Sequence, residues 1–250
     1  MSYTIDKEYF LRELFRVFEC NGIAALLDEQ KVEKLYKLTE IMLAENEKYN
    51  LTSITEIDKI ILLHYADSVL FADEFSYGAT VVDVGCGAGF PSVPLAICRP
   101  DLRITALDST AKRVNYVKMV SDTLSLGIET VCARAEDACR FGAKDTMREK
   151  FDYSTARAVA GLGVLCELCI PMVKIGGAFI AMKGKNGESE LSLSMQAIKK
   201  LGANLKKSEK TTLTDGHAPS QDRLLAVIEK LEPTPREFPR QYSQICKKPL

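Results

Sequence analysis

The segment VVDVGCGAGFPSVPLAI, residues 81–97, combines an acid with alternating glycines. Glycines at positions 85, 87 and 89 allow the backbone to turn with positive φ and to approach a ligand closely. A dinucleotide-binding fingerprint would place its third glycine at position 90, where it lets a helix pack on a strand. Phe90 stands there instead, and the carboxylate of Asp83 would repel a pyrophosphate. The spacing therefore argues against a nicotinamide-dependent dehydrogenase.

A ligand with cationic groups suits an acid in this place better. S-adenosylmethionine carries an ammonium and a sulfonium and has no phosphate, so Asp83 favours it through charge. The pattern therefore predicts that Asp83, Gly85 and Gly87 bind S-adenosylmethionine. The alternative is a tight strand-to-helix turn without a ligand.

A second acid, Asp108, closes the next predicted strand. It lies about 20 residues beyond the glycines, near the offset at which an acid binds ribose hydroxyls in such folds. A ribose belongs to dinucleotides and to S-adenosylmethionine alike, so Asp108 does not separate the two ligands. The alternative role is an N-cap for the helix predicted in STAKRVNYVKMV.

Two histidines and one CxxC pair are the other groups able to do chemistry. His64 shares a predicted helical face with several isoleucines, and we interpret it as a packed side chain. His217 falls in a predicted hairpin loop and is interpreted as solvated. Cys166 and Cys169 lie in the apolar stretch LGVLCELCIPMV without a second pair or a nearby histidine, which predicts buried helical cysteines and no metal site.

Short apolar runs after Gly78 predict the sheet that positions these residues. Strands are expected at 80–84, 103–108, 128–133, 151–156, 177–184, 204–213 and 223–230. The segments between the first five are long enough for crossover helices, which predicts a mostly parallel sheet. Only TDGHAPSQD separates the last two strands, which predicts a hairpin and an antiparallel end to the sheet. The triplet Arg134-Ala135-Glu136 then follows the third strand at the edge where such sheets bind ligands.

The first 77 residues are predicted to be helical. Apolar residues recur at helical spacing between Asp28 and Tyr49. A second helix is expected after Ser53, because Ser53 and Glu56 have the spacing of a capping box. The sequence thus predicts a helical extension at 1–77 and an α/β domain at 78–250.

Composition sets further bounds. The chain has 250 residues, a net charge of −1, and 46% hydrophobic and 27% charged residues. No apolar run approaches the ~20 residues of a membrane helix, and the charged N-terminus does not resemble a secretory signal, so we expect a cytoplasmic protein that does not bind a membrane. The balanced charge excludes the overall positive excess of a generalist nucleic-acid binder, but it leaves room for a local basic patch. Eight scattered cysteines are expected to be reduced thiols. The C-terminal basic cluster of Arg236, Arg240, Lys247 and Lys248 is expected to be a solvated tail, and a binding surface is the alternative.

Several stretches together resemble one known family. DVGCGAGFPSVPLAI, LDSTAKRVNYV, ARAED, TARAVAGL and MKG, with YNLTSI and LLHYADSVL before them and FPRQ and KKPL near the end, are similar to the glucose-inhibited division protein B family, the ribosomal RNA small-subunit methyltransferases G. The likeness covers roughly residues 40 to 250. It implies a Rossmann-like class I methyltransferase fold with an antiparallel final strand.

The resemblance also implies a reaction and further site residues. The reaction is methylation of guanine N7 in small-subunit ribosomal RNA by S-adenosylmethionine. Carried over by position, Gly85 and Phe90 match the family's cofactor loop, Ala135 and Glu136 its adenine-side turn, and Arg157 its arginine near the cofactor. Because guanine N7 carries no proton, no catalytic acid or base is assigned.

The expected partner is small-subunit ribosomal RNA or the small subunit itself, bound by a monomer. Lys183, which closes the fifth predicted strand, is predicted to form a basic rim for RNA phosphates together with Arg157 and Arg240. An acceptor that is a small molecule or a protein is the alternative, and a nucleotide-binding module without activity is a further one.

Overall fold

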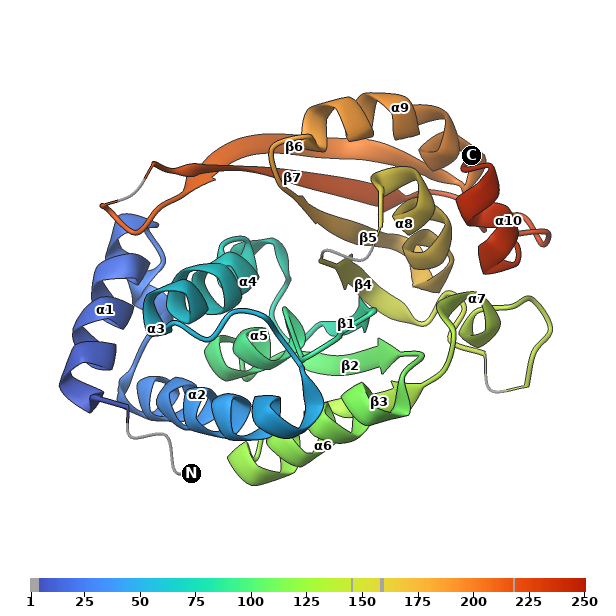
Figure 1. Ribbon diagram of the computed structural model, residues 1–250. Coiled ribbons are helices and arrows are strands. Elements are labelled where there is room, and N and C mark those ends of the chain that lie inside the picture. The colour runs from blue at the N-terminus through green and yellow to red at the C-terminus, as the bar shows by residue number, and fades with distance from the viewer. Residues whose placement is uncertain (1–4, 145, 158–159, 218) are drawn as a thin grey trace.

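The computed structural model describes residues 5–144, 146–157, 160–217 and 219–250. A seven-stranded sheet in the order β3-β2-β1-β4-β5-β7-β6 runs through the molecule (Figure 1). Strands β1 to β5 are mutually parallel, and β7 pairs antiparallel with both β5 and β6. The strands are β1 (Thr80–Val84), β2 (Arg103–Asp108), β3 (Glu129–Cys132), β4 (Phe151–Ala156), β5 (Val173–Lys183), β6 (Ala203–Leu213) and β7 (Gln221–Lys230).

All seven predicted strands and the antiparallel end are therefore confirmed. The largest difference is the start of β5, which lies four residues before the predicted one. The ladder with β4 is irregular there, since Phe151 pairs with Val173 but Tyr153 pairs with Ala178. The extra residues include Gly176 at φ +86°. Such a bulge lengthens the strand by residues that an apolar pattern does not mark.

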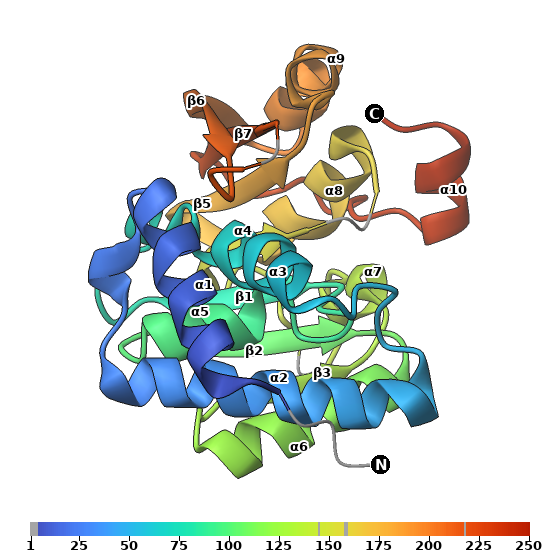
Figure 2. The same cartoon turned by 60° about the vertical axis from the view of Figure 1, so that its left-hand side comes forward.

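Alternate residues of the strands face two hydrophobic layers. In β5, Ala178 and Ile180 belong to one buried cluster, whereas Phe179 and Ala181 belong to the other. The first cluster lies under α5 (Ser92–Cys98) and α6 (Ala111–Leu124), the second under α8 (Leu162–Cys169) and α9 (Gly187–Lys200). A short α7 (Ala135–Ala138) follows β3, and α10 (Tyr242–Lys247) ends the chain on the α8 side. The result is a three-layer α/β arrangement, visible in two views in Figures 1 and 2.

The N-terminal region is helical, as predicted. It consists of α1 (Lys7–Cys20), α2 (Glu29–Tyr49), and one continuous helical segment of α3 (Ile57–Lys59), a π-helical stretch (Ile60–Ala66) and α4 (Asp67–Val69). Short 3₁₀ turns lie at Ala24–Leu26 and Ala72–Glu74 in this region. A third 3₁₀ turn, at Ile170–Met172, connects α8 to β5. The start of α2 is also as predicted, because the Asp28 side chain accepts from the amide of Lys31 at 2.9 Å.

The predicted capping box at Ser53 and Glu56 is wrong. The N-cap residue of α3 is Glu56, and its side chain makes no capping hydrogen bond. Thr52 holds the preceding turn instead, since its Oγ1 accepts from the amide of Ile54 at 3.0 Å. Ser53 therefore lies in a turn before the helix, where it cannot serve as the N-cap.

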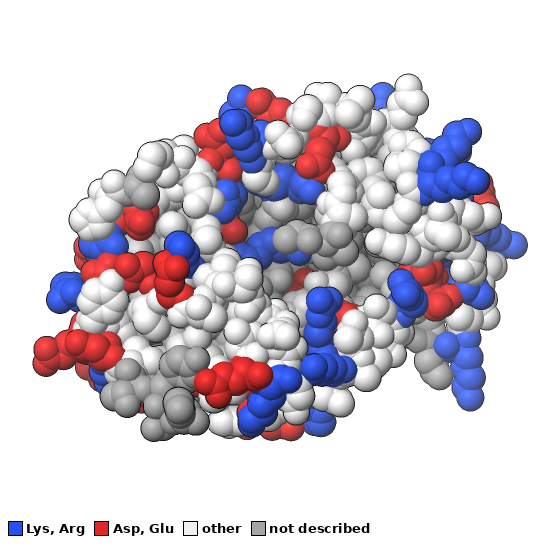
Figure 3. All heavy atoms as spheres, in the orientation of Figure 1, with Lys and Arg blue, Asp and Glu red and all other residues white. Residues whose placement is uncertain are grey.

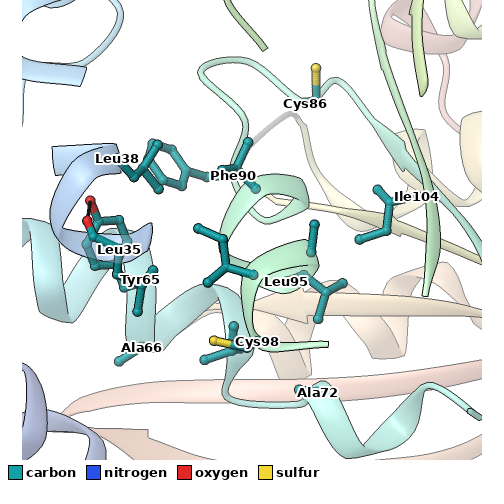
Figure 4. Close-up of a cluster of buried hydrophobic side chains, with 14 of the residues drawn as sticks. Leu35, Leu38, Tyr65, Ala66, Ala72, Cys86, Phe90, Leu95, Cys98 and Ile104 are labelled. Carbon is teal, nitrogen blue, oxygen red and sulfur yellow. Dashed lines mark hydrogen bonds between the residues drawn. The ribbon is translucent and has the colours of Figure 1, made fainter. Parts of the chain in front are cut away.

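The N-terminal helices pack on α5 and α6, the helices that cover one face of the sheet. Leu35 and Leu38 of α2 and Tyr65 of the π-helical stretch share one buried cluster with Leu95 of α5. Figure 4 shows these side chains together with Phe90, which lies in the loop just before α5. Residues 5–77 therefore share a hydrophobic core with one face of the sheet. No helix of the described residues is long and apolar enough to cross a membrane.

Candidate cofactor site

A cavity of about 400 Å³ opens at the carboxyl ends of β1, β2 and β4, next to the glycine-rich loop. The space-filling view in Figure 3 shows a hollow near the centre of one face, with lysine and arginine atoms inside it and along its edge. Seven of the predicted cofactor residues line the cavity, namely Gly85, Gly87, Phe90, Asp108, Ala135, Glu136 and Arg157. The structure thus brings together residues from four separate segments of the chain.

Asp83 is the exception, because it lies beneath the loop and not in the cavity wall. Its Oδ2 accepts from the amide of Ser92 at 3.2 Å and from the hydroxyl at 2.5 Å, which ties the end of β1 to the start of α5. Burial raises the pKa of its carboxyl to about 6. The other oxygen, Oδ1, is buried and has no hydrogen-bond partner among the described residues. Asp83 therefore fixes the loop and keeps one acceptor free.

The glycine-rich loop folds back onto β2. The amides of Gly85 and Cys86 donate to the carbonyl of Leu107 at 2.8 and 3.0 Å, and the amide of Gly87 donates to Asp108 Oδ2 at 3.1 Å. Gly89 has φ +88°, and a Cβ there would lie 2.6 Å from Val93 Cγ2. Glycine is required at this position by backbone conformation and by packing together.

Asp108 is buried at the end of β2 and faces the cavity. Besides Gly87, its carboxylate accepts from the amide of Thr110 at 2.8 Å and lies 3.5 Å from Arg113 Nη1. The N-cap residue of α6 is Thr110, so Asp108 does not occupy the capping position that was its alternative role. The carboxylate is thus oriented by backbone donors at the cavity floor.

Phe90 and His64 form a stacked aromatic pair in the cavity wall. Their ring centroids lie 4.1 Å apart with an interplanar angle of 5°. His64 Nε2 lies 3.0 Å from Thr52 Oγ1, and burial together with the charge of Arg157 lowers the pKa of the imidazole to about 3. The prediction of a packed histidine is confirmed, but His64 also lines the cavity, which the sequence did not indicate.

Arg157 lies between the cavity and the N-terminal helices. Its guanidinium sits 5.6 Å from the Phe90 ring centre, and Nη1 donates to the carbonyl of Leu63 at 2.6 Å and to Asp67 Oδ2 at 3.1 Å. Asp67 Oδ1 also accepts from Arg223 Nε of β7 at 2.6 Å. Asp67 therefore bridges two arginines, and neither Asp67 nor Arg223 was singled out from the sequence.

On the opposite side, the turn after β3 meets the C-terminal helix. Arg134 lies over the ring of Tyr242 at 5.7 Å, and both line the cavity beside Glu136. Tyr242 was missed by the sequence analysis, because nothing near it in the chain marks a ligand site. It reaches the cavity only through the packing of α10.

Lys183 and Arg240 do not line the cavity. Lys183 Nζ lies 2.8 Å from Glu190 Oε2 and donates to the carbonyl of Ala160 at 3.0 Å. Arg240 is paired with Glu167 through two guanidinium nitrogens. Both cations are thus committed to carboxylates within the protein.

The remaining sequence candidates lie away from the cavity. Cys166 and Cys169 are buried free thiols on α8, as predicted, and His217 is exposed. Within the described ranges, no cluster of three or more histidine, cysteine or acidic residues is arranged to hold a metal ion.

The fold has counterparts among solved structures. One solved structure with the same fold is TYW2 of M. jannaschii in complex with AdoMet, with a TM-score of 0.50 and 13% identity, covering 82% of this chain and 78% of that chain. Another is P. horikoshii TYW2 in complex with MeSAdo, with a TM-score of 0.50 and 13% identity, covering 65% of this chain and 60% of that chain. The likeness to both is one of fold, an α/β arrangement around a mostly parallel sheet.

Comparison with curated proteins defines the family. Residues 31–218 match the family model described as rRNA small subunit methyltransferase G. Proteins named ribosomal RNA small subunit methyltransferase G from Clostridium perfringens and Lactobacillus acidophilus are 42% and 44% identical, covering 92% and 90% of this chain and 95% and 93% of their own length. The chain belongs to this family, and its cofactor is S-adenosylmethionine.

Proposed function

We propose that the enzyme methylates N7 of a guanine in small-subunit ribosomal RNA. The observation that carries the acceptor class is the family membership, since relatives that match nearly the whole chain are named for this RNA. The expectation of N7 comes from the family resemblance, and the cavity supports only the broader expectation that the acceptor is a nucleobase. The stacked rings of His64 and Phe90 offer an aromatic surface of the kind against which proteins hold an extruded base.

The residues around the cavity fit S-adenosylmethionine. We propose that the backbone at Gly85 and Gly87 lies against the cofactor, that Asp108 accepts from the ribose hydroxyls, and that Ala135 and Glu136 border the adenine. Phe90 and Arg157 would flank the methionine end. Asp83 lies outside the cavity wall, so it would contribute to cofactor binding from beneath the loop, through its negative charge and its hold on Ser92.

Positioning is the main catalytic contribution that these residues can make. When bound, S-adenosylmethionine supplies an electrophilic methyl group on a positively charged sulfur. Guanine N7 carries a lone pair and no proton, so the reaction requires no general base. The pKa of His64 is lowered, and its Nε2 is hydrogen-bonded to Thr52 Oγ1. The imidazole is therefore suited to holding a nucleobase and not to transferring a proton. The rim of the site must tolerate a purine that becomes cationic.

Contacts with the RNA backbone are best assigned to cations at the mouth of the cavity. Arg113 lines the cavity and has a side chain that is 53% exposed, and Arg134 lines it as well and is exposed. Lys183 and Arg240 were the earlier candidates, but their side chains are only 11% and 24% exposed and lie in closer ion pairs, at 2.8 and 2.6 Å, than the 3.5 Å contact of Arg113 with Asp108. We therefore assign the phosphate contacts to Arg113 and Arg134.

The N-terminal extension is part of the same proposal. Leu51, Thr52 and His64 come from residues 1–77 and line the cavity, so this region would complete the acceptor side of the site. A monomer acting in the cytoplasm agrees with an RNA substrate. Analytical ultracentrifugation of the purified protein tests the monomer.

Mass spectrometry of ribosomal RNA tests the reaction. We expect a strain without the gene to lack one 7-methylguanosine in small-subunit RNA, and the purified enzyme with S-adenosylmethionine to restore it on small subunits from that strain. Unchanged methylation of the RNA in the deletion strain would contradict the proposal and favour a protein or a small molecule as acceptor.

A further inference from the structure

The chain after β7, residues 231–250, is held firmly against the protein. The guanidinium of Arg148 donates to the carbonyls of Phe238 at 2.6 Å and Pro235 at 3.1 Å, and also to that of Thr234. The side chains of Phe238 and Ile245 are buried in the same hydrophobic cluster as α8. We call residues 231–250 the C-terminal segment. The expectation that its basic residues form a solvated tail is wrong for Arg240, because Arg240 is anchored in this packing.

The anchor is the ion pair between Arg240 and Glu167. Glu167 lies on α8 and is 0% exposed. Its Oε1 accepts from the Arg240 amide at 2.8 Å and from Nε at 2.9 Å, and its Oε2 accepts from Nη2 at 2.6 Å. A buried carboxylate with three charge-assisted or backbone donors has a strong preference for one geometry. The pair therefore fixes the point at which the chain enters α10.

This geometry places Tyr242 in the wall of the cofactor cavity. Tyr242 is the first residue of α10, two residues after the anchor. Tyr242 is half-buried, its ring lies 5.7 Å from the guanidinium of Arg134, and it lines the same cavity as Ala135 and Glu136. Figures 1 and 2 show α10 beside α8 and close to α7 in both views.

We propose that Tyr242 is a cofactor-binding residue that contacts the adenine ring of S-adenosylmethionine, and that Arg240 and Glu167 are its positioning residues. An aromatic ring bound on one face by a cation is well suited to contact a flat, neutral heterocycle on another side. The region that matches the family model ends at residue 218, so this part of the site lies beyond it. The inference concerns the cofactor and holds whichever acceptor the enzyme methylates.

Calorimetric titration with S-adenosylhomocysteine, without RNA, tests the contact. Tyr242→Ala should weaken binding about five- to tenfold, in line with the loss of an aromatic contact. Tyr242→Phe keeps the ring and should lose less than Tyr242→Ala. The matched control is Lys247→Ala on the same helix, an exposed residue that does not line the cavity. Affinity of the Tyr242→Ala variant within twofold of the unaltered protein overturns the proposal.

A fluorescence experiment tests the positioning pair. The chain has no tryptophan, so Tyr242→Trp introduces a single indole at the cavity. Its emission should change on titration with S-adenosylhomocysteine, whereas that of Tyr77→Trp should not, because Tyr77 is 88% exposed and does not line the cavity.

Adding Glu167→Gln to the Tyr242→Trp protein should reduce the emission change and weaken binding severalfold. Arg240→Lys keeps the charge but loses the paired geometry, so it should reduce the emission change and the affinity to a smaller degree. It replaces Glu167→Gln in the test if that variant does not fold. An unchanged ligand response in a folded variant of the pair would contradict the positioning role. Because no RNA enters these assays, their failure is separate from any failure of the proposed RNA reaction.

Discussion

The imidazole of His64 lies flat on the ring of Phe90, with 4.1 Å between ring centroids and 5° between planes. The contact joins the π-helical stretch of the N-terminal region to the glycine loop that follows β1. Arg157 lies over the same phenyl ring at 5.6 Å. A neutral imidazole is compatible with that cation and with a base that gains positive charge, whereas an imidazolium would oppose both.

We predict that His64 makes the protein less stable in acid. Burial, and then the charge of Arg157, lowers the pKa of the imidazole from 6.5 to about 3. Since the unfolded chain takes up the proton at a higher pH than the folded protein, the stability that this neutral histidine contributes is fully present above pH 6.5 and is lost as pH falls toward 3. The slope should reach at most about 1.4 kcal/mol per pH unit.

His64→Phe is the comparison that isolates this effect. It keeps an aromatic ring on Phe90 and removes the titrating group. The stability difference between the unaltered protein and the variant, measured by urea unfolding, should be constant above pH 6.5 and should shift against the unaltered protein below it. Asp83 is present in both proteins, so its titration affects their free energies of unfolding alike and does not contribute to the difference between them. A difference that does not depend on pH would contradict a neutral His64.

Gly89→Ala should destabilise the cofactor loop. At φ +88° an added Cβ would be strained, and it would lie 2.6 Å from Val93 Cγ2. The expected cost is about 2–4 kcal/mol, from left-handed backbone and overpacking together. Gly127→Ala is the matched control, because φ is +68° there and no atom lies within 4 Å of the added Cβ. It should cost only ~1–2 kcal/mol in urea unfolding, and equal losses at both positions would show that packing against Val93 contributes nothing.

Local patterns explain what could be predicted from the sequence. The strands were marked by short apolar runs, and the cofactor loop by glycines that adjoin Asp83 along the chain. The capping box failed because Ser53 has the right spacing but lies in a turn before the helix begins. The spacing of Ser53 and Glu56 alone does not reveal that a turn separates Ser53 from the first residue of the helix.

The missed residues depend on contacts between distant parts of the chain. Asp67 and Arg157 are 90 residues apart, and Asp67 and Arg223 are 156 apart, so no local pattern connects them. Arg240 and Lys183 carried the right charge for RNA, but Glu167 and Glu190 pair with them in the fold. Charge in a sequence indicates where a cation is and does not indicate which anion it meets.

Asp67→Asn should be strongly destabilising and should weaken cofactor binding. The side chains of Asp67, Arg157 and Arg223 are 15%, 13% and 13% exposed, so removal of the shared carboxylate leaves two largely buried guanidinium groups without their anion. Loss of one partner of such a buried pair costs about 3–5 kcal/mol. Arg157 would also lose the contact that orients it beside Phe90, which should lower affinity for S-adenosylhomocysteine in calorimetry.

The control is Asp122→Asn, which removes an exposed pair. Lys118 and Asp122 lie 3.2 Å apart with side chains that are 62% and 67% exposed. Its cost in urea unfolding should stay below ~1 kcal/mol. A similar cost for both substitutions would show that the Asp67 bridge behaves as an ordinary surface pair.

Neutralising Arg113 or Arg134 at the mouth of the cavity should weaken RNA binding and make that binding less dependent on salt concentration. Each phosphate contact contributes about −0.7 to −0.9 to the slope of log K against log salt, so Arg113→Gln and Arg134→Gln should each reduce the slope by about that amount. Filter binding of small-subunit RNA over a range of KCl concentrations measures this slope.

Lys118→Gln, on the exposed surface of α6, is the control and should leave the slope unchanged. Lys183→Ala should also leave the slope unchanged, because Lys183 is paired with Glu190 and lies outside the cavity. If Lys183→Ala reduces the slope and the two arginine variants do not, the RNA backbone follows the rim predicted from the sequence.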